Sequence, residues 1–117
     1  MNRDELKERT KQFALRVMRL VDALPKSTKG RALTGQLVRS GMSVAANYRA
    51  ACRARSKADF ISKLGVVEEE ADESALWMEL LIEGGLVPGR RLERLLDEAN
   101  QLTAILVASR KTSVGKR

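Results

Sequence analysis

Four stretches of the chain carry apolar side chains at the three- and four-residue spacing of an amphipathic helix, and capping or breaking residues bound each one. Asn2, with Glu5 three residues later, resembles a capping pair at the start of the first stretch, and Pro25 stops it. Ser27 or Thr28 can cap the second. The apolar positions of these two stretches are Leu6, Phe13, Val17, Leu20 and Leu24, followed by Leu33, Leu37, Val44, Tyr48 and Ala51 or Cys52.

Capping and helix-ending residues also mark two helices in the second half of the chain. Ser56 and Asp59 form a capping pair that opens a third helix, about 40 Å long, which Gly84-Gly85 ends. Pro88 suits the first turn of a fourth helix. The apolar positions are Phe60, Leu64, Val67, Ala71, Ala75, Met78 and Leu81 or Ile82, followed by Leu92, Leu95, Ala99, Leu102 and Leu106. Since short connections join antiparallel neighbours, the sequence predicts an all-α, antiparallel up-down-up-down four-helix bundle.

The length and the core composition agree with a single helical domain. A chain of 117 residues can build one core but not two. Its apolar residues are mostly Ala, Leu and Val, with only four aromatic side chains, and such a composition suits helices better than a sheet. We assign residues 1–109 to the bundle and residues 110–117, four of which are basic, to a disordered tail.

Membrane and secretion signals are missing from the sequence. No apolar run reaches the roughly 20 residues that a bilayer span requires. The N-terminal residues 1–8 are mostly charged or polar and lack the apolar stretch of a signal peptide. The sequence therefore predicts a cytoplasmic protein without a membrane partner.

The residue types leave little room for catalysis or metal binding. There is no histidine, and Cys52 is the one cysteine, so the chain has neither the usual nucleophile and base nor a zinc ligand set. The acids of residues 68–73 could attract Mg²⁺ or Ca²⁺, but a solvated or ion-paired helix face is the commoner use of such a run. We predict no enzymatic activity, catalytic residue, metal or cofactor, and we assign Cys52 no role.

Charge is sorted by segment. Residues 26–58 contain eight Lys or Arg and no acid, whereas residues 59–83 contain eight acids and one Lys. This pattern indicates two adjacent helices of opposite sign. Because the net charge is +7 and the pI is near 10, nucleic acid (RNA or DNA) is the first external partner to consider.

Five basic residues are the predicted nucleic-acid contacts. Phosphate binding needs several cations along one face, since each neutralised phosphate releases counterions. Two of the five basic residues are four positions apart on the second helix, two follow in the adjoining turn, and one lies further back on the same helix. The set is Arg49, Arg53, Arg55, Lys57 and Arg31.

An alternative is that the acidic third helix neutralises the basic second one. If the turn centres on residue 55, antiparallel pairing places Arg39 opposite residue 71, within reach of Asp72 or Glu68. In that case the charge sorting serves only self-assembly and partner docking, and the protein is a protein–protein scaffold without a nucleic-acid role.

Two features predict a subunit interface. The second helix is lined with small residues, and Ser40, Ser43 and Asn47 could hydrogen-bond across a close helix contact, either between subunits or within the core of one chain. The third helix has a second apolar row that includes Trp77 and Leu80, more than one core needs. The alternative for Trp77 is a core residue whose indole N–H finds a partner.

Three spaced segments resemble a known family. They are Arg39-Ser-Gly-Met-Ser-Val-Ala-Ala-Asn47, Ser56-Lys-Ala-Asp-Phe60 and Glu69-Glu-Ala-Asp-Glu-Ser-Ala-Leu-Trp-Met-Glu-Leu-Leu81. This chain resembles the bacterial four-helix-bundle proteins encoded in intervening sequences of 23S rRNA genes, and the likeness extends from Phe13 to Leu106.

The resemblance implies a non-enzymatic bundle that assembles as a ring, commonly a homopentamer. The superfamily is similar to the accessory variability protein of diversity-generating retroelements, a basic pentamer that binds nucleic acid and a reverse transcriptase. Many members carry an acid and a glycine after the position of Asn47, where this chain has Tyr48-Arg-Ala-Ala-Cys-Arg-Ala-Arg. The departure makes this surface more basic.

Overall fold

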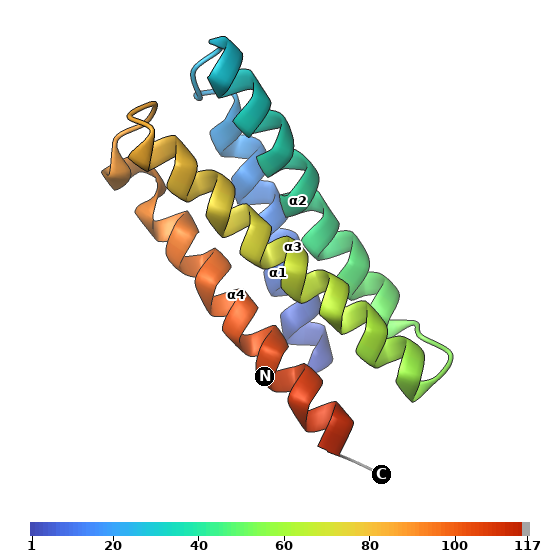
Figure 1. Ribbon diagram of the computed structural model, residues 1–117. Helices are drawn as coiled ribbons and strands as arrows, with labels where there is room; N and C mark the ends of the chain where they lie inside the picture. Colours follow the sequence, from blue (N-terminus) through green and yellow to red (C-terminus); the bar gives the residue numbers. More distant parts are fainter. Residues whose placement is uncertain (116–117) are drawn as a thin grey trace.

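The computed structural model describes residues 1–115 and folds them into four antiparallel helices (Figure 1). The helices are α1 (Arg3–Val21), α2 (Thr28–Cys52), α3 (Lys57–Glu83) and α4 (Gly89–Gly115). Each packs along its neighbour in the chain, and α1 also touches α4, though over a smaller area. The predicted up-down-up-down bundle is confirmed, and it forms a rod of 49 × 20 × 19 Å.

Three of the helices begin at the side chains that the sequence marked as caps. The Asn2 side chain accepts a hydrogen bond from the Glu5 backbone N–H at 2.8 Å, and Ser56 accepts one from the Asp59 N–H at 3.0 Å. Ser27 caps α2 by accepting from the Gly30 N–H at 3.2 Å, which decides between the two candidates for that position. Each cap satisfies a backbone donor that has no partner within the helix.

The core is built from the side chains of the four predicted apolar rows. Aliphatic and aromatic side chains from all four helices meet along the axis of the rod, and the half-buried ones close its edges. No helix in residues 1–115 is both long and apolar enough to cross a membrane. The largest side chains that are fully buried are Phe13, Leu37, Leu64, Met78, Leu81, Leu92, Leu102 and Leu106.

The prediction of a disordered tail from residue 110 is wrong as far as residue 115. Helix α4 continues to Gly115, and Arg110 donates from Nε to Glu68 of α3 at 2.7 Å. Ser113 donates back to the Ser109 carbonyl at 2.9 Å. The partner that orders this segment lies 42 residues earlier in the chain, which is why composition alone did not reveal it. Residues 116 and 117 lie outside the described part of the chain.

Helices α2 and α3 are joined by a polar contact inside the core. Ser40 and Ser74 are fully buried, and their hydroxyl oxygens are 2.8 Å apart. Ser74 donates to the Glu70 carbonyl at 2.9 Å, so the Ser40 hydroxyl is the donor to Ser74, and the Leu37 carbonyl oxygen lies 3.3 Å from Ser40 Oγ. Both hydroxyls therefore have partners, which removes the usual cost of burying a polar group.

Two glycines of α2 are expected to respond in opposite directions to replacement by Ala. A Cβ on Gly30 would lie 2.2 Å from the Pro25 carbonyl oxygen, so the α1–α2 turn would have to move, whereas nothing lies within 4 Å of a Cβ on Gly35. We expect Gly35→Ala to stabilise the protein by up to about 1 kcal/mol through helix propensity. Gly30→Ala should destabilise it instead. Urea unfolding of both variants checks this, and a gain in stability with Gly30→Ala would contradict the close approach.

Candidate nucleic-acid interface

The turn between α2 and α3 gathers exposed cations at one end of the rod. Arg53 is the C-terminal cap of α2, Arg55 lies in the turn and Lys57 is the first residue of α3. All three side chains are exposed. They surround the N-terminus of α3, where the helix dipole adds partial positive charge. The structure thus brings together three of the five predicted contacts.

A fourth cation joins them from the other end of the sequence. Arg3, in the first turn of α1, lies with its guanidinium carbon 4.4 Å from the centre of the Phe60 ring. Together with Arg55 and Lys57 it lines a cleft of about 460 Å³. Sequence reasoning missed Arg3, although antiparallel pairing places the start of α1 beside the end of α2. We call Arg3, Arg53, Arg55 and Lys57 the turn surface.

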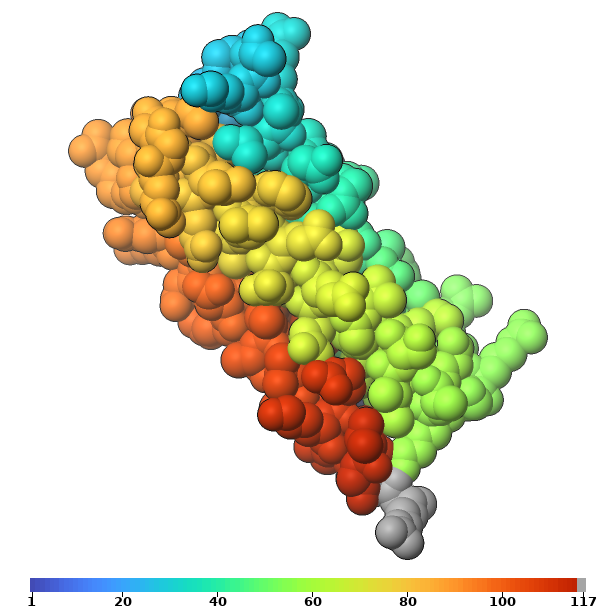
Figure 2. Space-filling view, viewed as in Figure 1, coloured from blue at the N-terminus to red at the C-terminus, as the bar shows by residue number. Residues whose placement is uncertain are grey.

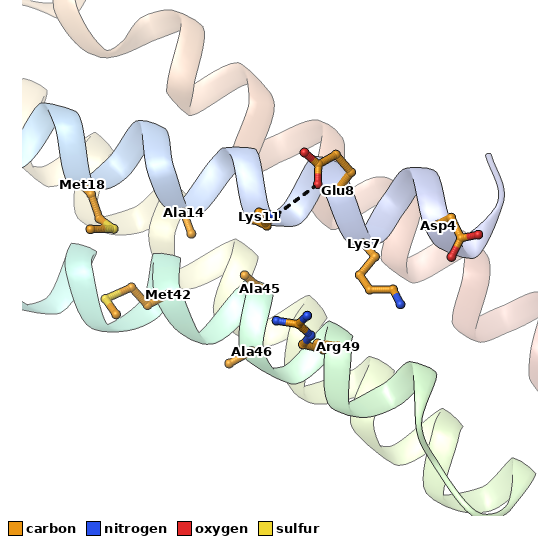
Figure 3. Close-up of a pocket in the computed structure, with 10 residues that line it drawn as sticks. All are labelled: Asp4, Lys7, Glu8, Lys11, Ala14, Met18, Met42, Ala45, Ala46 and Arg49. Carbon is orange, nitrogen blue, oxygen red and sulfur yellow. Dashed lines mark ion pairs between the residues drawn. The ribbon is translucent and has the colours of Figure 1, made fainter.

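The other two predicted contacts lie elsewhere. Arg31 is 22 residues before Arg53, which is about 33 Å along α2, and its Nε donates to the Lys26 carbonyl at 2.9 Å. Arg49 is exposed one turn before the end of α2, but it faces α1 (Figure 3). Arg31 thus lies further back on α2, as expected, and the length of the helix separates it from the turn surface, so its role as a nucleic-acid contact stays a prediction. Arg49 lies next to the turn surface rather than within it.

The acids of α3 neutralise very little of the basic segment. Arg39 pairs with Glu70 at 2.8 Å and with Glu73 at 2.9 Å, not with Asp72 or Glu68 as expected. The predicted level along the helix was right, but the rotation of α3 turns Glu70 and Glu73 toward α2. Glu68 pairs with Arg110 of α4, and Asp72 is exposed.

The ion pairs also decide how much positive charge remains free. Of the eight basic residues between 26 and 58, Arg39 is the one that pairs with an acid within residues 1–115. Asp59, two residues after Lys57 in the sequence, accepts from Lys63 at 2.8 Å instead. The turn surface is therefore not cancelled by neighbouring acids.

A groove between α1 and α2 is a second hollow of the surface (Figure 3). It encloses about 460 Å³, and Met18 and Met42 face each other across it with 49% and 48% of their surface exposed. Charged side chains stand along the rest of the groove, among them Lys7 and Arg49, and Glu8 pairs with Lys11 at 3.7 Å. Sequence reasoning missed this groove because both methionines lie outside the predicted apolar rows.

The predicted interface residues divide into three kinds. Ser40 is buried inside the chain, so the reading as a core contact of one chain holds and its assignment to a subunit interface is wrong. Ser43 and Asn47 are half-buried and bond to each other, with Asn47 Nδ2 donating to Ser43 Oγ at 2.7 Å. Their place in an interface stays a prediction.

The third kind lies on the outer side of α3. Leu80 is 42% exposed, and Leu76 and Val66 are exposed to a similar degree. Trp77 packs half-buried against the core, and its indole N–H has no hydrogen-bond partner among residues 1–115. The last finding differs from the alternative weighed for Trp77, in which this N–H was paired. Figure 2 looks onto the side of the rod that α3 and α4 form.

Burial and hydrogen bonding shift the pKa of a few side chains in the bundle. Burial raises the pKa of the Tyr48 phenol, and the neighbouring Cys52 raises it further, so Tyr48 stays neutral. Hydrogen bonding to Glu68 raises the pKa of Arg110, which therefore stays charged. Within residues 1–115 no three acidic or cysteine side chains lie close enough together to hold a metal ion.

Comparison with known proteins supplies an independent result. A model of the 23S rRNA-intervening sequence protein family matches residues 4–108. The chain is also similar to a crystal structure of a protein with unknown function from the S23 ribosomal protein family, from Bacteroides thetaiotaomicron. The two share 32% sequence identity and superimpose with a TM-score of 0.86 over 95% of this chain and 99% of that one. No curated protein matches the sequence.

Proposed function

The chain belongs to the 23S rRNA-intervening sequence protein family, and from that premise we propose that it is a non-enzymatic, oligomeric nucleic-acid-binding accessory protein. Its ligand is RNA or DNA, and its contact is the turn surface with the adjacent Arg49. The resemblance to ring-forming relatives supports assembly of several copies, with five as the expected number.

The observation that carries this proposal is that the turn surface is exposed and unneutralised. Arg53, Arg55 and Lys57 have no ion-pair partner within residues 1–115, although an acidic helix begins directly beside them. Folding makes no use of these charges, and holding like charges together has an electrostatic cost. A phosphate backbone would relieve that cost and would release counterions on binding.

The geometry favours binding without sequence readout. The cations surround a helix N-terminus, where phosphate oxygens can accept from guanidinium groups and from backbone N–H groups. Such contacts fix position on the backbone and carry no base information. We therefore expect RNA and DNA of different sequence to bind alike.

Self-assembly has its own support in the exposed apolar side chains. Leu76 and Leu80 on α3 are 43% and 42% exposed, and Met18 and Met42 leave the α1–α2 groove open. Large apolar side chains gathered on a helix face are typical of subunit contacts. In a closed ring every copy would present one turn surface, so weak contacts would add up to useful avidity.

A protein–protein scaffold is the second candidate function, and the groove of Figure 3 favours it. Methionines exposed in a groove can adapt to different apolar partners, and the charges along the groove could select among them. A scaffold needs no phosphate contact. It would therefore leave RNA unbound at low and at moderate salt.

Light scattering of the purified protein, with and without a short structured RNA, tests the proposed function. We expect a pentamer-sized particle that binds RNA at low salt and releases it at moderate salt. The affinity should fall steeply with salt, because each phosphate contact releases counterions on binding. A stable oligomer that ignores RNA at both salt concentrations would favour the scaffold. A monomer would contradict the assembly part of the proposal.

A further inference from the structure

The seam between α1 and α4 holds a second basic cluster, which the proposed function does not use. A cleft of about 240 Å³ lies there, and no acid lines it. Its polar lining is four arginines, two from each helix, of which three are exposed and one is half-buried. They are Arg16 and Arg19 of α1 and Arg91 and Arg94 of α4, and we call their site the arginine cleft.

None of these arginines is neutralised by the protein. Within residues 1–115 no ion pair involves any of the four. One contact satisfies part of one side chain, since Arg19 Nε donates to the Leu15 carbonyl at 3.3 Å. Leu20 of α1 and Leu95 of α4 supply the apolar part of the lining. Folding therefore does not require four cations around the cleft.

Two helical turns away, α1 and α4 are joined by an ion pair. Arg9 of α1 donates from Nε and Nη2 to the two carboxylate oxygens of Glu98 on α4, at 2.8 and 2.7 Å. Arg16 and Arg91 lie seven residues from Arg9 and Glu98 respectively, which is about 10 Å along each helix. Because the helices are antiparallel, Arg91 occupies the position opposite Arg16 that Glu98 occupies opposite Arg9. At the level of Arg9 and Glu98 the two helices are joined by an ion pair, whereas seven residues further along the seam two positive charges lie opposite each other.

A bound anion with several oxygens would remove this repulsion. Guanidinium groups present fork-shaped donor pairs that match phosphate oxygens, and arginines on two helices can grip one phosphate from two sides. We propose that the arginine cleft binds a phosphate group of a nucleic-acid backbone, as a second contact besides the turn surface. The identity of the ligand rests on the proposed function, whereas the phosphate chemistry rests on the cleft.

The phosphate chemistry is tested first, with inorganic pyrophosphate as the probe. At constant ionic strength, pyrophosphate well above its dissociation constant should raise the melting temperature of the wild type by about 5 °C relative to chloride. The Arg91→Gln/Arg94→Gln variant should lose most of this shift. Lys29→Gln/Lys111→Gln removes the same charge from exposed residues that do not line the cleft and should keep the shift.

A third variant separates a binding role from a structural one. Arg91→Glu places a carboxylate opposite Arg16, as Glu98 lies opposite Arg9. We expect it to raise the melting temperature of the free protein by about 1–3 °C and to remove most of the pyrophosphate shift. If Arg91 were needed for folding, the free variant would melt lower instead, and the proposal would be overturned.

RNA binding then decides the ligand. Arg91→Gln/Arg94→Gln should weaken binding of a short structured RNA about tenfold and, through the loss of one phosphate contact, lower the slope of log affinity against log salt by about 0.7 to 0.9. If the wild type binds RNA and the variant binds it equally well, the arginine cleft is not a nucleic-acid contact, and the proposed function at the turn surface still stands. A pyrophosphate shift without any RNA binding would overturn the nucleic-acid ligand together with the proposed function. If a glutamate-rich peptide raises the melting temperature more than pyrophosphate does, the cleft binds an acidic protein segment, and the proposal of phosphate binding is overturned.

Discussion

Replacing Arg53, Arg55 and Lys57 together with Glu is expected to lower the affinity for RNA at least about 100-fold at low salt. Each residue loses a charge-assisted contact of roughly 1.5–3 kcal/mol and gains repulsion from the phosphates. Helicity should stay the same, because all three side chains are exposed and Lys57→Glu places an acid in the first turn of α3, where the helix dipole favours it. Fluorescence anisotropy at several salt concentrations and far-ultraviolet circular dichroism measure the two effects.

The matched control reverses three cations outside the turn surface. Lys11→Glu, Lys26→Glu and Lys29→Glu also lower the net charge from +7 by two units each, to +1. We expect them to weaken RNA binding less than about tenfold, since long-range attraction is screened beyond roughly 10 Å. Equal losses in both variants would show that net charge, and not the turn surface, drives binding. Loss of helicity in the first variant would show that its residues are structural.

Phe13→Ala is expected to destabilise the protein by about 3–5 kcal/mol, the usual cost of removing a large buried aromatic side chain. Phe13 is fully buried, and α1 depends on such contacts because it packs mainly on one neighbour, α2. A domain of this size has a free energy of unfolding of about 5–15 kcal/mol, so much of its stability would be lost. Urea unfolding should give a lower midpoint, and thermal unfolding a melting temperature lower by more than about 10 °C.

Met18→Ala is the comparison variant on the same helix. Met18 lies five residues further on, and 49% of its surface is exposed in the groove of Figure 3. We expect this change to cost less than about 1 kcal/mol. A loss as large as that of Phe13→Ala would mean that the groove is covered in solution, and it would direct attention to subunit contacts there.

The helices could be predicted because the signals that define them are local. Asn2 and Ser56 cap helices through bonds to residues three positions later, and the apolar rows repeat within a few turns. The bundle follows from these elements, since short connections leave neighbouring helices little choice of direction. The family resemblance also depends on residues that the sequence displays, and the match over residues 4–108 confirms it.

Predictions that depended on helix rotation or distance fared less well. Arg39 was placed at the right level of α3 but with the wrong acids, because neighbouring residues on a helix point about 100° apart. Arg31 was expected further back on α2 than Arg53, and the structure places it about 33 Å away along the helix. Arg3 and Arg110 were misjudged because the residues they contact, Phe60 and Glu68, are remote in sequence.

The sequence by itself determined the fold class, the helix boundaries near their caps and the sorting of charge between α2 and α3. These depend on residue type and on spacings of a few positions. Only the tertiary structure decided which charges remain free, because an ion pair requires two side chains from different helices to point at each other. The packing of α3 between α2 and α4 turned Glu70 and Glu73 toward Arg39 and Glu68 toward Arg110. Within residues 1–115 it left the cations of the turn surface and of the arginine cleft without an ion-paired acid, and these are the two places where we propose that a phosphate binds.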